Sequence, residues 1–217
     1  MIKKTVIINR AVPGSGKTTI TNVIVSNLKS KGIPVSIHST DEYFMKDNSY
    51  DFKPEKLAEN HRKNLEAFIR DMEKGIPLVI CDNTNLSSWQ SEPYIEAARQ
   101  HNYQIIIINF TPRELEKHVE TQIITDERPD AHGIPPEDLI DKLDEYNRNL
   151  NLLDKSKPVT EENYREIWDN EINDTVKSDK LLNHYDLDHL INYMPEYYHD
   201  KNYDIGAVIL SLMEFIN

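Results

Sequence analysis

The feature that most constrains the fold is a glycine-rich loop between a short apolar run and a long amphipathic segment. Residues 6–9 are Val-Ile-Ile-Asn, and residues 11–19 are Ala-Val-Pro-Gly-Ser-Gly-Lys-Thr-Thr. From residue 18 to residue 29, apolar side chains recur at helical spacing. A strand, a glycine-rich turn and a helix in this order are the context of a phosphate-binding loop. We therefore expect the fold to be organised around this loop.

The residue types in the loop suit a bound nucleotide. Two glycines allow backbone N–H groups to converge on phosphate oxygens, and the following helix directs the positive end of its dipole to the same place. Lys17 is placed to bridge the outer phosphates, and the Thr18 hydroxyl to bind Mg²⁺. The predicted nucleotide-binding residues of the loop are Pro13, Gly14, Ser15, Gly16, Lys17, Thr18 and Thr19.

Two details refine this prediction. Ala11 stands where such loops normally begin with glycine, and its methyl group is tolerable if the local φ is negative. The sequence contains no Asn-Lys-x-Asp motif to recognise guanine, which favours ATP over GTP. We expect ATP and Mg²⁺ as cofactors.

Residues 1–150 alternate short β-branched runs with longer amphipathic segments. This pattern is typical of parallel strands connected by covering helices. We expect helices at 18–29, 53–74, 88–101 and from Pro136 onward, with Pro93 interrupting or restarting the third. We expect strands at 5–9, 35–38, 78–82 and 104–110.

The predicted fold class is α/β, with a three-layer α/β/α core of the P-loop NTPase type, a central parallel sheet and a mainly helical C-terminal extension. The predicted P-loop domain covers residues 1–168, including a lid at about 111–136 and a short strand at 164–168. Residues 169–217 form the predicted helical extension.

Composition excludes several partners. The chain has 37 acidic and 25 basic residues and a net charge of -12, so we expect no generic binding of duplex nucleic acid. Its one cysteine, Cys81, cannot form an internal disulfide, and no apolar run approaches the roughly 18 residues of a membrane span. We expect a soluble cytoplasmic protein with no membrane partner, and the oligomeric state stays open.

Two carboxylates follow strands at the sheet edge where ligands bind in this fold class. Asp82 ends an apolar run, like the aspartate that supports Mg²⁺ in P-loop enzymes. Asp41 follows another strand, where it could accept a hydrogen bond from a substrate hydroxyl and align it with the γ-phosphate. The alternative is that Asp41 caps the following turn. Two carboxylates facing one nucleotide favour a kinase over a simple ATPase.

Segment 111–136 has the features of a lid. It contains two Gly/Pro clusters that could act as hinges, together with two arginines. A kinase must exclude water and neutralise charge that develops on the transferred phosphoryl group. Arg128 is the predicted neutralising residue, and Arg113 is the second candidate, assigned to the nucleotide. The alternative for Arg128 is a surface ion pair with Asp126 or Asp130.

One predicted helix follows Asp41 and carries both polar and basic candidates. His61 and Asn64 lie three residues apart on one face, where contact with substrate and a place in the core are equally favoured. Basic residues nearby could line a groove for a single-stranded end, although a solvated helix face is slightly favoured. They are Lys46, Lys53, Lys56, Arg62 and Lys63.

Five motifs in a fixed order carry a family resemblance. They are residues 10–19, Ser39-Thr40-Asp41-Glu42-Tyr43-Phe44, His61 with Asn64, Asp82-Asn83-Thr84-Asn85 with Trp89 and Pro93-Tyr94, and His132-Gly133-Ile134-Pro135. Together they resemble the P-loop kinases grouped with polynucleotide 5′-hydroxyl kinase and the zeta toxins.

The resemblance covers about the first 150 residues and implies a three-layer kinase core. It makes Asp41 the acceptor-side catalytic carboxylate and Arg128 the lid arginine. With the reasoning above, the predicted catalytic residues are Asp41, Lys17 and Arg128, and the predicted metal-binding residues are Thr18 and Asp82. The predicted substrate-side residues are Asp82, Asn83, Asn85, His61, Asn64 and Tyr43.

Two positions depart from that family. Phe44 stands where phage-type polynucleotide kinases have a phosphate-binding arginine, and Pro129 replaces a polar or basic lid residue. The leading hypothesis is an ATP- and Mg²⁺-dependent kinase that transfers the γ-phosphate to a hydroxyl, foremost a nucleic-acid 5′ end. The alternatives are a kinase for a nucleoside, sugar or antibiotic, and an ATP-binding regulatory or toxin-like module without an acceptor.

Overall fold

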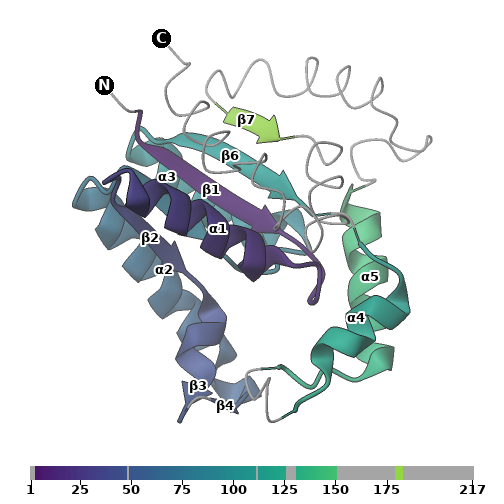
Figure 1. Cartoon of the computed structure of the whole chain (residues 1–217). Helices are drawn as coiled ribbons and strands as arrows, with labels where there is room; N and C mark the ends of the chain where they lie inside the picture. The colour runs from purple at the N-terminus through teal and green to yellow at the C-terminus, as the bar shows by residue number, and fades with distance from the viewer. Residues whose placement is uncertain (1–2, 48, 111, 126–130, 151–178, 183–217) are drawn as a thin grey trace, which may run out of the picture.

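The computed structural model describes residues 3–47, 49–110, 112–125, 131–150 and 179–182 (Figure 1). At its centre lies a five-stranded sheet in the order β2-β5-β1-β6-β7, with all neighbouring strands parallel. The strands are β1 (Thr5–Arg10), β2 (Val35–His38), β5 (Leu78–Cys81), β6 (Gln104–Asn109) and β7 (Asp179–Leu182).

Helices cover both faces of this sheet, so successive residues of a strand enter two different cores. Ile7 of β1 packs in the cluster that contains α1 (Lys17–Ser30). Val6 and Ile8 pack in the opposite cluster with α2 (Leu57–Glu73) and α3 (Ser88–Gln100). The predicted three-layer α/β/α architecture is confirmed.

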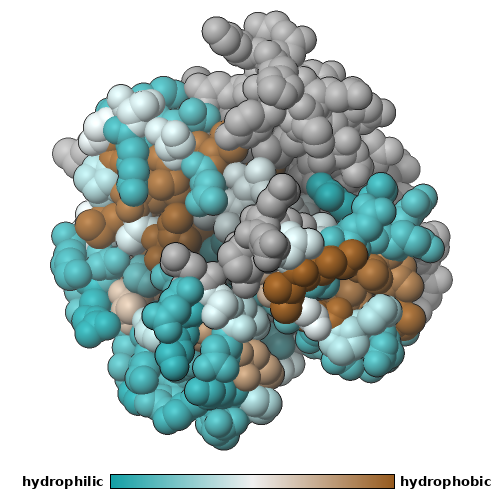
Figure 2. Space-filling view, turned by 60° about the horizontal axis from the view of Figure 1, so that its bottom comes forward, coloured by the Kyte–Doolittle hydropathy of each residue, from teal (hydrophilic) through white to brown (hydrophobic). Residues whose placement is uncertain are grey.

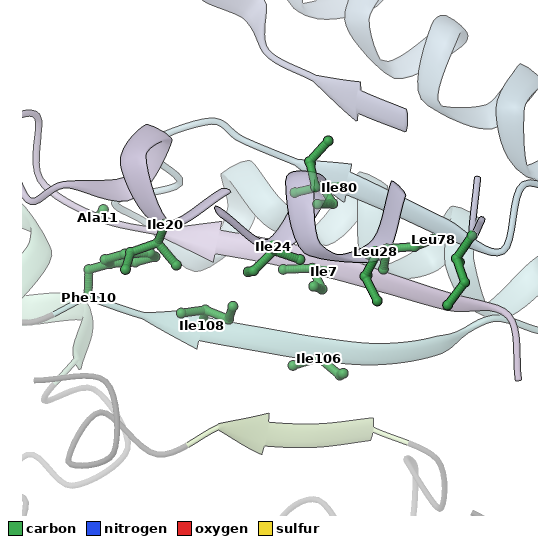
Figure 3. Packing of buried hydrophobic residues seen from close by; sticks show 12 residues of the cluster. Ile7, Ala11, Ile20, Ile24, Leu28, Leu78, Ile80, Ile106, Ile108 and Phe110 are labelled. Carbon is green, nitrogen blue, oxygen red and sulfur yellow. The ribbon is translucent and has the colours of Figure 1, made fainter. Parts of the chain in front are cut away.

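Figure 3 shows the α1-side core, in which one stripe of the helix projects onto the strands. Ile20, Ile24 and Leu28 lie at helical spacing and are at most 1% exposed. They pack with residues of β1, β5 and β6. Since α1 directly follows the glycine-rich loop, this packing fixes the direction in which the loop leaves the sheet.

The remaining elements lie beyond the sheet. Thr40–Phe44 forms the 3₁₀ helix η1, and a hairpin of β3 (Met45–Lys46) and β4 (Ser49–Tyr50) follows, then η2 (Pro54–Lys56). The helices α4 (Leu115–Gln122) and α5 (Pro136–Leu150) contact each other and lie beyond the carboxyl ends of β1 and β6 (Figure 1).

Helix α5 is anchored behind the glycine-rich loop by Tyr146. This side chain is fully buried and packs with Val12 and Leu86. Its hydroxyl donates to the Arg10 carbonyl oxygen at 2.8 Å. The loop is therefore held from a distant part of the chain as well as by its own strand and helix.

Three predicted features differ in the structure. Pro93 does not interrupt α3, so that prediction was wrong. A proline removes the N–H that would bond the Trp89 carbonyl, but residue 89 is 69% exposed, where water can take the place of the missing donor. The segment expected to be a lid contains helix α4, which the sequence analysis did not predict. The prolines and glycines elsewhere in the segment had indicated hinges instead.

The third difference concerns the C-terminal part. Residues 179–182, assigned to a helical extension, form β7 and pair with β6 in the core sheet. The strand predicted at 164–168 lies outside the described residues. In the described part of the chain, no helix has both the length and the apolar character needed to cross a membrane.

Candidate functional site

The glycine-rich loop connects β1, at the centre of the sheet, to α1 (Figure 1). Gly14 and Gly16 have left-handed backbones, with φ of 87° and 84°. The Ala11 N–H donates to the Thr84 carbonyl oxygen at 2.8 Å. The φ of Ala11 is not positive and its methyl group is buried, so the structure accommodates alanine at this position.

Lys17, Thr18 and Asp82 meet at the end of this loop. The Lys17 ammonium donates to the Asp82 carbonyl oxygen at 2.6 Å and lies 3.3 Å from the Asp82 carboxylate. The Thr18 hydroxyl lies 3.3 Å from the other carboxylate oxygen, Oδ2. The structure thus brings the predicted phosphate-binding lysine together with the two predicted metal-binding residues.

Asp82 is only 3% exposed, and two buried side chains orient it. The Asn9 amide donates to Asp82 Oδ1 at 2.7 Å, and the Thr21 hydroxyl donates to the same oxygen at 3.0 Å. Both donors were missed by the sequence analysis. The available signal was a polar residue at a position that the pattern of β1 or α1 predicts to be buried.

A third acid, Glu42, lies near the same centre. Partial burial raises the pKa of Glu42, and the negative charge of Asp82 raises it further. The sequence analysis did not single out Glu42, although it follows Asp41 directly. Its proximity to Asp82 places one more carboxylate on the ligand side of the sheet.

Asp41 lies in η1, and the rings of Tyr50 and His132 both approach its carboxylate. The Tyr50 hydroxyl donates to Asp41 Oδ1 at 3.2 Å, and His132 Nε2 lies 3.9 Å from Oδ2. The Tyr50 and His132 rings are stacked with centroids 4.1 Å apart. Ser39, rather than Asp41, occupies the cap of η1. The Asp41 side chain is 38% exposed, so it remains accessible to an acceptor.

The pKa of the Tyr50 hydroxyl lies far above its ordinary value because the side chain is partly buried and faces the Asp41 charge. Tyr50 therefore stays protonated and can act only as a donor to this carboxylate at neutral pH.

The predicted amides hydrogen-bond to groups in η1, α3 and β1. Asn83 Oδ1 accepts the Thr40 N–H at 2.8 Å, and the Asn83 and Asn64 amides both donate to the Tyr94 hydroxyl. Asn85 has a φ of 46°, and its amide donates to the Asn9 carbonyl oxygen at 2.7 Å. All three amides are buried, so their direct contact is with protein groups, and the predicted substrate contact stays a prediction.

Other predicted residues are accessible. Tyr43, 40% exposed, lies on η1 near Asp41. His61 is exposed on α2, and its Nδ1 lies 3.1 Å from the Thr40 hydroxyl. Partial desolvation of its ring lowers the pKa of His61, and the Asp41 charge raises it in part. Thr19 is exposed at the start of α1, on the same side as the loop.

Of the two predicted arginines, Arg113 is described and Arg128 lies outside the described residues. Partial burial lowers the pKa of the Arg113 guanidinium. The backbone N–H of Arg113 donates to Nε2 of His118 at 2.9 Å, and Nδ1 of the same ring lies 2.6 Å from the Pro13 carbonyl oxygen. The predicted nucleotide arginine is therefore connected to the glycine-rich loop through His118, a residue that the sequence analysis missed.

Four of the five basic residues near Asp41 form ion pairs on the surface. Lys53 lies 3.0 Å from Asp51. Lys56 and Lys63 lie 3.0 Å and 2.8 Å from Glu59, and Arg62 pairs with Glu66. This favours a solvated helix face over a cationic groove. Seen from the end that carries β3 and β4, the surface is largely hydrophilic with separate apolar patches (Figure 2).

The family model described as chromatin associated protein KTI12 matches residues 5–186. The chain belongs to the KTI12 family. The match includes β7, in agreement with its place in the core sheet. The parallel sheet, the glycine-rich loop and the covering helices give this KTI12-family chain a P-loop NTPase fold. Its assignment to the polynucleotide kinase group stays a prediction.

A human protein, NEDD4-binding protein 2, is 30% identical to the KTI12-family chain over 149 residues. The aligned part is 66% of this chain and 8% of the human protein, so the chain corresponds to a small piece of that relative.

The similar solved structures include a Kti12 and an APS kinase. Kti12 of Chaetomium thermophilum in complex with ADP-AlF3 is 16% identical, with a TM-score of 0.47, covering 79% of this chain and 98% of that one. The Mycobacterium tuberculosis APS kinase CysC in complex with AMPPNP and APS is 12% identical, with a TM-score of 0.45, covering 62% and 78%. Likenesses of this size are too weak to transfer a property to the chain.

Proposed function

We propose that the chain is an ATP- and Mg²⁺-dependent phosphotransferase that transfers the γ-phosphate to a hydroxyl acceptor. The observation that carries the proposal is the pairing of two carboxylates with one P-loop. Asp82 lies against Lys17 and Thr18, and Asp41 follows the edge strand β2 on the same side of the sheet. A simple ATPase needs the first group, whereas a kinase also needs the second.

The residues around Thr18 fit Mg²⁺. Its hydroxyl and Asp82 Oδ2 are hard oxygen ligands that lie 3.3 Å apart, and Mg²⁺ is commonly held by one or two such groups plus phosphates and water. A bound Mg²⁺ would neutralise charge on the phosphates. Asn9 and Thr21 hold Oδ1 of Asp82, which leaves Oδ2 to face the ion.

On the acceptor side, Asp41 would accept a hydrogen bond from the substrate hydroxyl and take its proton late in the transfer. Tyr50 donates to one oxygen of this carboxylate and thereby restrains its orientation. Lys17 would move from Asp82 to the transferred phosphate, since an ammonium group binds phosphate as a mobile point charge.

Two acceptors remain in competition. The family resemblance favours the 5′ end of a single-stranded nucleic acid. A small hydroxyl compound is favoured by Phe44, which is 4% exposed and therefore offers a nucleic-acid phosphate no contact. The ion pairs of Lys56 and Lys63 with Glu59 also favour a small acceptor.

The deciding experiment is transfer from labelled ATP and Mg²⁺ to three acceptor sets: a 5′-hydroxyl oligonucleotide, a panel of nucleosides, sugars and antibiotics, and no acceptor. We expect transfer to one set and its loss in Asp41→Asn. The matched control is Asp51→Asn, which removes a nearby surface carboxylate that pairs with Lys53. Retained transfer in Asp41→Asn would overturn the proposal. ATP binding without transfer to any acceptor would favour a regulatory module.

Arg128 has its own test. If it neutralises charge on the transferred group, Arg128→Ala should fold normally and reduce turnover about 10³-fold. An unchanged rate would show that Arg128 has no such role.

A further inference from the structure

His118 is the fully buried residue of α4, and both of its ring nitrogens contact backbone groups. The Nδ1–H donates to the Pro13 carbonyl oxygen at 2.6 Å, and Nε2 accepts the Arg113 N–H at 2.9 Å. One ring thus bridges the glycine-rich loop and the segment that precedes α4.

The two hydrogen bonds require one specific form of the ring. Nε2 must be unprotonated to accept, so the proton of the neutral ring sits on Nδ1. Burial lowers the pKa of His118. The hydrogen bond to Pro13 opposes this shift and the positive charge of Arg113 adds to it, and the net lowering favours the neutral ring at pH 7.

Helix α4 also packs against the turn of the loop. A Cβ atom added to Gly14 would collide with the Thr121 hydroxyl and lie 3.3 Å from His118 Nδ1. The Thr121 hydroxyl donates to the His118 carbonyl oxygen at 2.6 Å, which holds it in that place. The close approach of α4 therefore requires glycine at position 14.

The bond to the Pro13 carbonyl determines the direction of the next N–H. All described peptide bonds are trans, so the Pro13 carbonyl and the Gly14 N–H lie in one plane and point in opposite directions. With its carbonyl held by His118, this peptide must direct the Gly14 N–H away from α4. Glycine alone would resist a flip of this peptide only weakly, because its backbone tolerates both signs of φ.

We propose that His118 is a positioning residue for the nucleotide: it locks the Pro13–Gly14 peptide so that the Gly14 N–H faces the phosphates. A flipped peptide would instead present a carbonyl oxygen and repel the anion. This inference rests on the proposed nucleotide binding, and it adds that the lid side of the molecule sets the shape of the phosphate site.

Two variants separate the two hydrogen bonds of the ring. His118→Asn places an amide near the position of Nδ1, where it can still donate to Pro13. His118→Gln places an amide near the position of Nε2. There it can accept from the Arg113 backbone N–H, but it loses the hydrogen bond to the Pro13 carbonyl oxygen. Both remove the same ring, so their losses of packing are similar.

The measurement is titration with a fluorescent ATP analogue and Mg²⁺, together with melting temperatures. We expect His118→Gln to bind about tenfold more weakly than wild type, as for one lost hydrogen bond, and His118→Asn to stay within about threefold. Equal affinities of the two variants, or the reverse order, would overturn the inference. If His118→Gln does not fold, His118→Leu replaces it, and wild-type affinity in that variant would overturn the inference. A wild-type protein that binds no ATP would overturn the proposed function and this inference with it.

Discussion

The two halves of the candidate site differ in how firmly the protein holds them. Asp82, on the nucleotide side, is 3% exposed and receives hydrogen bonds from Asn9 and Thr21. Asp41, on the acceptor side, is 38% exposed and is held by Tyr50 from a two-residue strand. The nucleotide half is therefore preorganised, and the acceptor half is open to adjustment.

The position of each half in the sheet explains the difference. The glycine-rich loop follows β1, which has β5 on one side and β6 on the other, with α1 and α5 packed around it. Asp41 follows β2, an edge strand, and lies beside a small hairpin. Fixed dipoles are what phosphate binding needs, whereas an acceptor site can be completed by the acceptor itself.

The largest expected effect comes from Gly14→Ala in the preorganised half. The added methyl group meets Thr121, and the φ of +87° is unfavourable for alanine. We expect a loss of roughly 3 kcal/mol in unfolding free energy and at least about 100-fold in ATP affinity. Urea denaturation and nucleotide titration measure the two.

Gly32→Ala is the matched control. Gly32 has a φ of +74° but nothing within 4 Å of an added Cβ. It should lose only the backbone contribution of about 1–2 kcal/mol and bind ATP normally. Similar results for both glycines would show that α4 does not constrain the loop.

Thr21→Val should have the next largest effect, because it removes a buried donor to the Asp82 carboxylate without changing the shape of the side chain. We expect a loss of about 1–3 kcal/mol in unfolding free energy. Thr18 is exposed, so Thr18→Val should change stability by less than about 0.5 kcal/mol while weakening Mg²⁺-dependent ATP binding. Equal destabilisation by both changes would contradict the difference in burial.

A smaller effect is expected from pH. Burial lowers the pKa of His38 and His118 from the ordinary 6.5, although Asp71 opposes the shift at His38. The unfolded chain then binds protons more readily, so stability is complete above pH 6.5 and falls as pH drops below it. Each residue contributes at most about 1.4 kcal/mol per pH unit. Urea titrations at pH 7.5 and 5.5 should show this, and His118→Asn should reduce the slope. A stability that is flat over this range would contradict the prediction.

The smallest effect is expected in the open half. Tyr50→Phe removes the hydrogen bond to Asp41 but keeps a ring that can stack on His132. We expect a change of about 0.5–1 kcal/mol in unfolding free energy and an unchanged ATP affinity. Thermal unfolding and ATP titration test this. A marked loss of ATP affinity would mean that the two halves are coupled, contrary to the comparison above.

Much of the core could be predicted because its signals are local. The strand at 35–38 matches β2, and the other three predicted strands differ from β1, β5 and β6 by one residue at an end. Periodicity and glycine-rich turns express these elements within short windows of sequence. The nucleotide side was predicted on the same basis, since the loop, Lys17 and Thr18 are contiguous.

Other features depend on partners far along the chain. The strand β7 exists through pairing with β6, which lies 70 or more residues earlier. Asn9, Thr21 and His118 are single polar residues in apolar surroundings, and their roles depend on Asp82 and Pro13 from other segments. A polar residue in an apolar pattern can be noticed locally, but no local pattern shows which distant group it holds.

The sequence by itself determined the P-loop, its parallel sheet and the place of Asp41 and Asp82 at strand ends, because strand, turn and helix signals act over a few residues. The tertiary structure alone decided which side chains hold those groups, from Asn9 and Thr21 on Asp82 to His118 on the loop. Hydrogen bonds and ion pairs join atoms by distance in space, and that distance is set only when the elements pack together.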